Sequence, residues 1–182
     1  MYDDAVAEVL ITEDEIRDKI AAMAKQISAD YDGREIRMVG VLKGAFMVMS
    51  DLARALSVPL SIDFMSVASY GSGTSTSGVV RILKDLDRDV AGQHVLVVED
   101  VIDSGLTLNW LLRNLRARQP ASIEVAALLR KPAAAQVEVP VKYVGFDLDT
   151  VFVVGYGLDY AERYRNLPFI GTLRDGIATD PR

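Results

Sequence analysis

The sequence predicts an α/β domain built on a largely parallel sheet. Short runs rich in Val, Ile and Leu, typical of buried strands, alternate with amphipathic segments of helical spacing in one continuous series. The chain has 182 residues, enough for one domain with a full core and too few for two comfortable ones. We find no internal repeat and no interdomain linker. We therefore expect residues 1–182 to form a single domain.

The composition narrows the class of protein. Hydrophobic residues make up 50% of the chain and charged residues 25%, which is typical of a globular protein. The net charge of −6 argues against nucleic-acid binding as the main role, because such binding depends on neutralising phosphates with Lys and Arg. The absence of cysteine excludes disulfides and thiolate chemistry. The acidic N-terminus lacks the features of a signal peptide, and no apolar run approaches the roughly 20 residues that span a bilayer, so we expect a cytoplasmic protein without a membrane partner.

The first predicted elements are a helix and a strand. A helix is expected over residues 13–31, because apolar residues recur there every three or four positions. Thr12 followed by Glu15 fits a capping box at its start, and Gly33 breaks the pattern after its end. Residues 36–42 then form an apolar run typical of a strand buried on both faces.

The middle of the chain continues the alternation. A second helix is expected from just after residue 44 to about Leu56. Strands are expected over residues 59–67 and 79–83. Residues 69–78, between these strands, are rich in Gly, Ser and Thr, and by composition alone this segment is typical of a flexible surface loop.

The second half repeats the same order of elements. Residues 94–98 form the clearest buried strand of the chain. A helix is expected over residues 106–118, where leucines line one face. Further strands are expected over residues 123–129, 141–146 and 151–154. The series as a whole indicates a mostly parallel sheet with helical connections.

Loops that follow strands are the places to look for a ligand. In parallel sheets, ligands bind beyond the carboxyl ends of the strands, where loops and helix N-termini converge. Three such loops follow residues 42, 98 and 129. The second has the most unusual composition, because two adjacent carboxylates, Glu99 and Asp100, stand at the end of its strand.

The turn after these carboxylates has the features of an anion site. Residues 103–105 lead into the predicted helix, so free backbone N–H groups and the helix dipole would face a bound anion. The hydroxyls of Ser104 and Thr107 add donors, and Gly105 permits a close backbone approach. A solvated loop in which Asp103 or Ser104 caps the helix is the alternative interpretation. We call the turn at residues 103–107 the anion cup. A sugar phosphate fits the whole loop, because the two carboxylates bind hydroxyls directly or through Mg²⁺ and the anion cup binds the phosphate.

The run VVEDVIDSGLTL at residues 97–108 resembles the phosphoribosyl-diphosphate motif of the type I phosphoribosyltransferases. Within that superfamily the chain is similar, over nearly its whole length, to the purine enzymes that act on hypoxanthine and guanine. Three further segments carry the resemblance in the same order: VGVLKGAF at 39–46, SYGSGTSTSG at 69–78 and FVVGYGLDYAERYRNL at 152–167. Several matching segments in order are far more specific than one short motif.

The resemblance implies both a fold and a reaction. The fold is a central, mostly parallel sheet flanked by helices, with a small hood subdomain formed by the N- and C-terminal segments. The reaction is the Mg²⁺-dependent transfer of a 5-phosphoribosyl group from phosphoribosyl diphosphate to hypoxanthine or guanine. Its products are IMP or GMP and pyrophosphate. A homodimer or homotetramer is implied as well.

The resemblance also assigns residues to the phosphoribosyl donor. The carboxylates after residue 98 would hold the ribose hydroxyls and an associated Mg²⁺, and the turn at residues 103–107 would wrap the 5′-phosphate. The loop after residue 42 would contact pyrophosphate. The segment 69–78, which starts with Ser69 and Tyr70, would close over the site and exclude water. The donor residues are Lys43, Gly44, Ser69, Tyr70, Glu99, Asp100, Ser104, Gly105, Leu106, Thr107, Asp159 and Arg165, with Glu99, Asp100 and Asp159 as Mg²⁺ ligands.

A second group of residues is assigned to the base. Asp103 would exchange a proton at the imidazole ring of the purine, as a general acid–base catalyst. Lys131 would donate to the exocyclic oxygen of a 6-oxopurine, and an ammonium donor there rejects the amino group of adenine. Phe152 would stack on the base, the backbone of Val153 would bond its edge, and Val101 would close the other side.

Two other functions stay open at this point. A xanthine-preferring phosphoribosyltransferase would share all of these residues. A non-catalytic regulator could use the same fold to sense the donor and bind RNA or DNA. The acidic composition and the complete set of base-binding residues count against the regulator.

Overall fold

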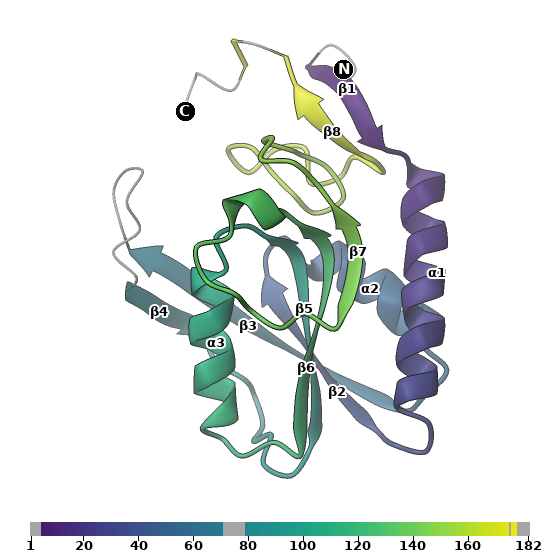
Figure 1. The fold of residues 1–182 in the computed structure, drawn as a ribbon, viewed down its shortest axis with the longest axis vertical. Helices are drawn as coiled ribbons and strands as arrows, with labels where there is room; N and C mark the ends of the chain where they lie inside the picture. The colour runs from purple at the N-terminus through teal and green to yellow at the C-terminus, as the bar shows by residue number, and fades with distance from the viewer. Residues whose placement is uncertain (1–4, 71–78, 175, 178–182) are drawn as a thin grey trace.

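The computed structural model describes residues 5–70, 79–174 and 176–177, and its main feature is a six-stranded sheet with helices on both faces (Figure 1). The strand order is β4-β3-β2-β5-β6-β7. Every neighbouring pair is parallel except β3 and β4, so the predicted mostly parallel α/β fold is confirmed. The strands are β2 (Ile36–Leu42), β3 (Leu60–Tyr70), β4 (Val79–Lys84), β5 (His94–Ile102), β6 (Ser122–Arg130) and β7 (Tyr143–Asp147).

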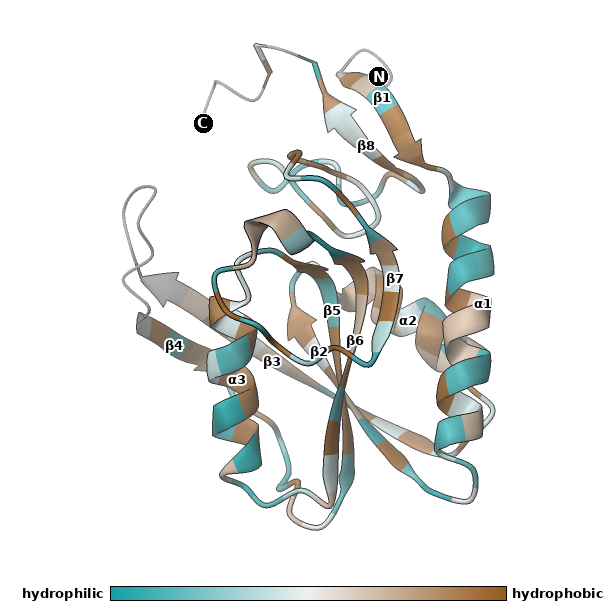
Figure 2. Cartoon of the chain, in the orientation of Figure 1, coloured by the Kyte–Doolittle hydropathy of each residue, from teal (hydrophilic) through white to brown (hydrophobic). Residues whose placement is uncertain are grey.

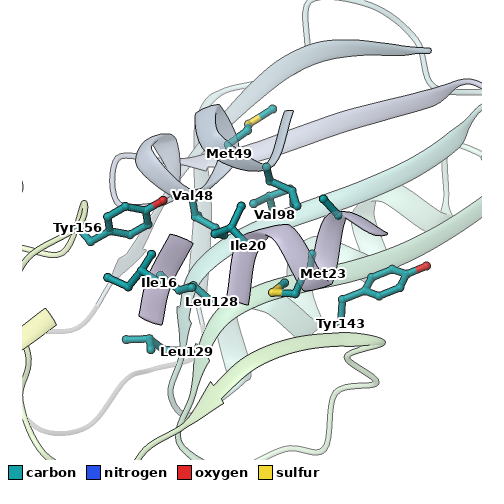
Figure 3. Close-up of a cluster of buried hydrophobic side chains, with 14 of the residues drawn as sticks. Ile16, Ile20, Met23, Val48, Met49, Val98, Leu128, Leu129, Tyr143 and Tyr156 are labelled. Carbon is teal, nitrogen blue, oxygen red and sulfur yellow. The ribbon is translucent and has the colours of Figure 1, made fainter. Parts of the chain in front are cut away.

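Helices α1 (Glu13–Asp30) and α2 (Phe46–Ala55) cover one face of this sheet. The capping box predicted for α1 is present, because Thr12 Oγ accepts from Glu15 N and the Glu15 carboxylate accepts from Thr12 N. Ile16, Ile20 and Met23 point from α1 toward the sheet, as Figure 3 shows. Each such buried side chain stabilises the fold by roughly 1.5–3 kcal/mol, so this apolar face holds α1 against the sheet.

Helix α3 (Leu106–Arg116) covers the opposite face. Its leucines, including Leu108 and Leu111, pack on the side chains of β2, β5 and β6 that point away from α1. Figure 2 shows the central strands largely apolar, with hydrophilic residues on the outer parts of α1 and α3. Burial on both faces explains why β5 and β6 are nearly continuous apolar runs rather than alternating ones.

A second, two-stranded sheet lies beyond the carboxyl ends of the main strands (Figure 1). It pairs β1 (Val6–Ile11) with β8 (Ile170–Leu173) in antiparallel register. Analysis of the sequence did not predict either strand, although the resemblance implied a hood made of the two terminal segments. Both strands are short and their pairing joins opposite ends of the chain, so no local pattern marks them.

Several predicted elements differ from the observed ones. Residues 151–154 are not a strand, and in the described part of the chain Val154 alone there forms a bridge, with Gly171. Strand β5 continues through Ile102 instead of ending at residue 98, because its ladder with β6 runs on to Arg130. Helix α2 begins at Phe46. Helix α1 ends at residue 30 instead of 31, and α3 ends at residue 116 instead of 118.

The described part of the chain contains no helix that is long and apolar enough to cross a membrane.

Candidate active site

The three loops predicted to bind a ligand lie at one edge of the sheet. Strands β2, β5 and β6 are adjacent and parallel, so their carboxyl ends point the same way. The loops that follow them carry Lys43, the turn at residues 103–105 and Lys131, and Lys131 Nζ lies 3.8 Å from Asp103 Oδ2. This arrangement is the one that parallel sheets use for ligands.

A cavity of about 260 Å³ lies at the start of α3. Its polar lining comes from Glu99, Asp103, Ser104, Gly105 and Thr107, which includes most of the predicted anion cup. The first hydrogen bond of the helix runs from Asn109 N to Gly105 O, so the amides of the preceding first turn are not used by the helix ladder. These amides carry the positive end of the helix dipole, and the cavity can therefore hold an anion.

Gly105 is required by the geometry of this turn. It has a φ of +78°, in the left-handed region that L side chains rarely adopt. A Cβ at this position would lie 2.8 Å from the carbonyl oxygen of Val137. Ser104 adds a hydroxyl that accepts weakly from Leu106 N, at 3.4 Å. The turn is thus shaped by backbone conformation rather than by a side-chain cap.

The two adjacent carboxylates are placed differently from each other. Glu99 and Asp100 are consecutive residues within β5, so their side chains leave opposite faces of the strand. Glu99 is 8% exposed and lines the cavity at α3, whereas Asp100 lies against Gly44. They lie inside the strand rather than just beyond its end, which corrects the predicted boundary.

Burial dominates the electrostatics of this pair. Desolvation raises the pKa of Glu99 well above its ordinary value, and the nearby charge of Asp100 raises it further. Desolvation also raises the pKa of Asp100, with Arg165 opposing and Asp159 reinforcing the shift. Among the described residues no three His, Asp or Glu side chains converge into a complete metal site. A divalent cation would therefore need further ligands from substrate or water.

The loop after β2 packs tightly between two other parts of the site. The Leu42–Lys43 peptide bond is cis. A Cβ on Gly44 would overlap the carboxylate of Asp100, and a Cβ on Gly157 would overlap the carbonyl oxygen of Gly44. Gly44 therefore lies in direct contact with both Asp100 and Gly157. Gly157, which has a φ of +99° and meets a backbone oxygen, has room only for glycine.

An ion-pair network joins this loop to the segment around Arg165. Arg165 Nη2 lies 2.9 Å from Asp159 Oδ1, and Arg165 Nη1 donates to Gly157 O at 2.8 Å. Asp159 Oδ2 accepts from Glu162 N at 2.8 Å, and Lys43 Nζ lies 2.8 Å from Glu162 Oε2. Arg165 Nε is buried and has no hydrogen-bond partner among the described residues.

Asp103 and Lys131 face each other at the other side of the anion cup. Their Oδ2 and Nζ atoms are 3.8 Å apart. The side chain of Asp103 is 61% exposed and that of Lys131 is 10% exposed, so a buried ammonium group meets an accessible carboxylate. A second cavity of about 160 Å³, lined in part by Asp103, Lys131 and Val137, adjoins them.

Phe152 and Val153 differ sharply in burial. Phe152 is 53% exposed, and its ring meets that of Tyr160 edge-on at 5.9 Å. Val153 is buried in the core below, and Val154 exchanges two backbone hydrogen bonds with Gly171, of 2.9 and 3.0 Å. An exposed aromatic ring on an anchored backbone is a suitable platform for a flat ligand.

Most of the predicted site residues thus lie around one edge of the sheet. The lining of the anion cavity includes Glu99, Val101, residues 103–105 and Thr107, and Leu106 is the first residue of α3. Ser69 and Tyr70 end β3, where their backbones pair with Val80 and Val79. Their side chains and residues 71–78, which hold the predicted closing loop, lie outside the described residues.

Sequence reasoning missed two contributors. Gly157 packs on the loop at Gly44, and Glu162 pairs with Lys43 across 119 positions of the chain. Glu162 lies in the segment that carried the resemblance, so its proximity to Asp159 was visible in the sequence. Its contact with Lys43 was not, because an ion pair between distant segments leaves no local pattern.

Comparisons with known proteins agree with this geometry. Residues 11–161 match the family model for the phosphoribosyl transferase domain. The chain is 54% identical over 188 residues to a hypoxanthine-guanine phosphoribosyltransferase of Mycobacterium tuberculosis, with 100% of this chain and 90% of the relative covered. A crystal structure of a hypoxanthine phosphoribosyltransferase from Staphylococcus aureus is similar with a TM-score of 0.95 at 43% identity, covering 99% of this chain and 97% of that one. A hypoxanthine phosphoribosyl transferase from Trypanosoma cruzi, studied for the role of its C-terminal region in oligomeric state and activity, is similar with a TM-score of 0.89 at 41% identity, covering 94% and 93%.

Proposed function

The chain belongs to the phosphoribosyltransferase family, and we propose from this premise that it transfers a 5-phosphoribosyl group from phosphoribosyl diphosphate to hypoxanthine or guanine in purine salvage. The products are IMP or GMP and pyrophosphate. The observation that carries the proposal is the anion cavity at α3, which has a buried carboxylate on one side and the Asp103–Lys131 pair on the other. A phosphorylated sugar and a polar flat base are the ligands that these neighbouring features fit together.

The donor binds at two groups of residues. The first-turn amides of α3, with Ser104 and Thr107, hold the 5′-phosphate, because the helix dipole and free N–H groups favour an anion there. Lys43, Gly44 and Arg165 hold the pyrophosphate end. The guanidinium group of Arg165, which Asp159 and the carbonyl oxygen of Gly157 hold in place, supports this role because it is a donor suited to phosphate oxygens.

Mg²⁺ is the cofactor that we propose, with carboxylate oxygens from Glu99, Asp100 and Asp159. Because these side chains do not converge on one point, oxygens of the substrate and water would complete the coordination of each ion. Magnesium prefers carboxylate oxygens and is commonly held by one or two of them together with substrate phosphates. Burial raises the pKa of Glu99 and Asp100, so a bound cation would compensate for the cost of ionising them. When bound, Mg²⁺ supplies charge neutralisation for the leaving pyrophosphate.

The base binds between Phe152 and Val101, with the backbone of Val153 at its edge. Lys131 donates from its buried ammonium group to the 6-oxo oxygen, and adenine is disfavoured because it presents an amino donor instead. Asp103, which is accessible and 3.8 Å from Lys131, accepts or returns the proton of the imidazole ring. One purine nitrogen bonds to C1 of the ribose as the bond from C1 to the pyrophosphate oxygen breaks.

A competition assay tests this function directly. Purified protein, with Mg²⁺ and phosphoribosyl diphosphate, is given hypoxanthine, guanine, xanthine and adenine, and the nucleoside monophosphates are quantified. We expect IMP and GMP, with little AMP. Predominance of XMP would favour the xanthine-preferring enzyme. No consumption of any base, together with binding of RNA or DNA, would favour the non-catalytic regulator.

The domain organisation, the location and the oligomeric state of the protein stay predictions. Residues 1–182 form a single domain whose hood comes from the terminal segments. The molecule is cytoplasmic. It assembles as a homodimer or homotetramer, and the study of oligomeric state in the Trypanosoma cruzi relative makes this assembly worth measuring by light scattering.

A further inference from the structure

We propose that the hydrogen bond between Tyr156 and Asp51 is a positioning contact that holds the segment carrying Asp159 and Arg165 in place for the pyrophosphate end of the donor. This inference rests on the proposed function. Tyr156 Oη donates to Asp51 Oδ2 at 2.6 Å, between residues 105 positions apart. Asp51 lies on α2, the helix that directly follows the loop with Lys43 and Gly44.

Tyr156 has a backbone conformation that its surroundings must maintain. Its φ is +48°, and Gly155 and Gly157 on either side have φ values of +100° and +99°. A left-handed conformation is unfavourable for an L residue, and such residues persist where tertiary contacts determine them. Tyr156 is 9% exposed, and Figure 3 shows its ring at the edge of the core beside Val48 of α2. The phenol therefore anchors a turn that is unfavourable by itself.

The anchored turn controls the position of Arg165. Gly157 N donates to Arg165 O at 2.9 Å, and Arg165 Nη1 donates to Gly157 O at 2.8 Å. Arg165 Nη2 in turn contacts Asp159 at 2.9 Å. Since Gly157 follows Tyr156 directly, a shift of Tyr156 would reach both the guanidinium group and the carboxylate.

The same turn also packs on the loop after β2. Gly157 lies against the carbonyl oxygen of Gly44 so closely that a Cβ would overlap it. Asp51 lies in the second half of the helix that begins two residues after Gly44. The hydrogen bond from Tyr156 thus ties both loops that face the pyrophosphate to one helix, and it fixes their separation.

The base platform has a separate anchor. Val154 exchanges two backbone hydrogen bonds with Gly171 on β8, so Phe152 and Val153 are held from the hood side. Loss of the contact at Tyr156 should therefore affect the donor more than the base.

The test compares Tyr156→Phe with Tyr143→Phe. Tyr143 is a matched control, because its buried phenol also donates to a carboxylate, Asp30 Oδ2 at 2.8 Å, but does so between β7 and α1. We expect Tyr156→Phe to raise the KM for phosphoribosyl diphosphate about three- to tenfold, the effect of losing one hydrogen bond, with the KM for hypoxanthine changed by less than about twofold. Tyr143→Phe should change neither KM by more than about twofold.

Two variants of the acceptor separate positioning from packing. Asp51→Asn keeps an oxygen that can accept from the phenol and should retain a KM for the donor close to that of the unchanged protein. Asp51→Ala should raise it as Tyr156→Phe does. Because Asp51 is exposed on α2, these variants provide the test even if Tyr156→Phe does not fold.

The possible outcomes distinguish this inference from the proposed function. If the unchanged protein forms no nucleotide, the proposed function fails. If it is active but Tyr156→Phe or Asp51→Ala changes the two KM values equally, or no more than Tyr143→Phe does, the positioning role is wrong. Thermal unfolding of all four variants shows whether stability alone accounts for a change.

Discussion

Buried Glu99 lowers the stability of the ligand-free protein when its carboxyl group is ionised. It is buried in β5, and burial followed by the charge of Asp100 raises its pKa well above the ordinary value of 4.5. The folded state therefore binds a proton more tightly than the unfolded state does. The stabilising effect of that proton is complete below the unfolded pKa and is lost as the pH rises through the folded pKa. At neutral pH, Glu99 thus favours unfolding unless a cation or a ligand hydroxyl compensates for it.

We predict that Glu99→Gln raises the free energy of unfolding of the ligand-free protein at neutral pH by about 1 kcal/mol or more, since one pKa unit corresponds to about 1.4 kcal/mol. The gain should shrink as the pH falls toward 4.5, where the unchanged carboxyl is protonated. Urea unfolding at pH 5 and pH 8 measures both values, with Glu8→Gln at an exposed position of β1 as the control. A gain of equal size at both pH values would argue against titration of Glu99 as its cause.

Asp103 is the residue on which the proposed chemistry depends. Its side chain is mostly exposed and lies 3.8 Å from Lys131, so an amide should fit in its place. We predict that Asp103→Asn lowers kcat by about a hundred- to ten-thousand-fold, the range typical of general acid–base catalysis. The dissociation constant of the donor, measured by calorimetry with Mg²⁺ present, should change little. Comparable losses in turnover and donor binding would instead indicate that Asp103 serves to shape the turn before α3.

At the scale of elements, the anion cavity depends on how α3 begins. Gly105 lets the chain turn from β5 into the helix with a φ of +78°, and it lies close to Val137 O. We predict that Gly105→Ala lowers the free energy of unfolding by roughly 1 kcal/mol or more, because the left-handed conformation becomes strained and the Cβ meets a carbonyl. The KM for the donor should rise as well, since the cup must widen.

Gly33→Ala is the control for that prediction. Gly33 has a similar φ of +70°, but a Cβ there would have no neighbour within 4 Å, and it lies after α1. The Gly33→Ala variant should lose stability through backbone strain alone, and its KM for the donor should be unchanged. If both variants raise that KM equally, the effect of Gly105 does not come from the cup. Chemical unfolding and steady-state kinetics of the two proteins provide the comparison.

At the scale of the whole molecule, ligand binding should hold distant parts of the chain together. The site takes residues from the loops after β2, β5 and β6 and from the segment around Arg165. We predict that phosphoribosyl diphosphate with Mg²⁺ raises the Tm, because a ligand at a hundred times its Kd stabilises the folded state by about 2.7 kcal/mol. Donor with EDTA, and Mg²⁺ alone, should have smaller effects. An equal rise with EDTA would count against the metal.

Much of the architecture follows from local sequence patterns. The spacing of apolar residues in α1 and the capping box at Thr12 predicted that helix to within one residue. The continuous apolar runs predicted β2 and β5 as buried strands, because a strand covered on both faces needs no polar side, and residues 123–129 were predicted as a further strand, which is β6. The turn at residues 103–105 was likewise predicted, because a glycine between a strand and a helix allows the backbone conformation that a sharp turn needs.

The sequence by itself determined the α/β class, the anion cup and the residue types that the reaction requires. Only the tertiary structure decided which distant segments meet. It extended β5 through Glu99 along the ladder with β6, kept residues 151–154 out of the sheet, and paired β1 with β8. It also paired Glu162 with Lys43 in a salt bridge and brought Tyr156 into hydrogen-bond contact with Asp51. The physical reason is that periodicity and turn chemistry act within a few residues, whereas strand partners and ion pairs across the chain depend on packing that no local pattern records.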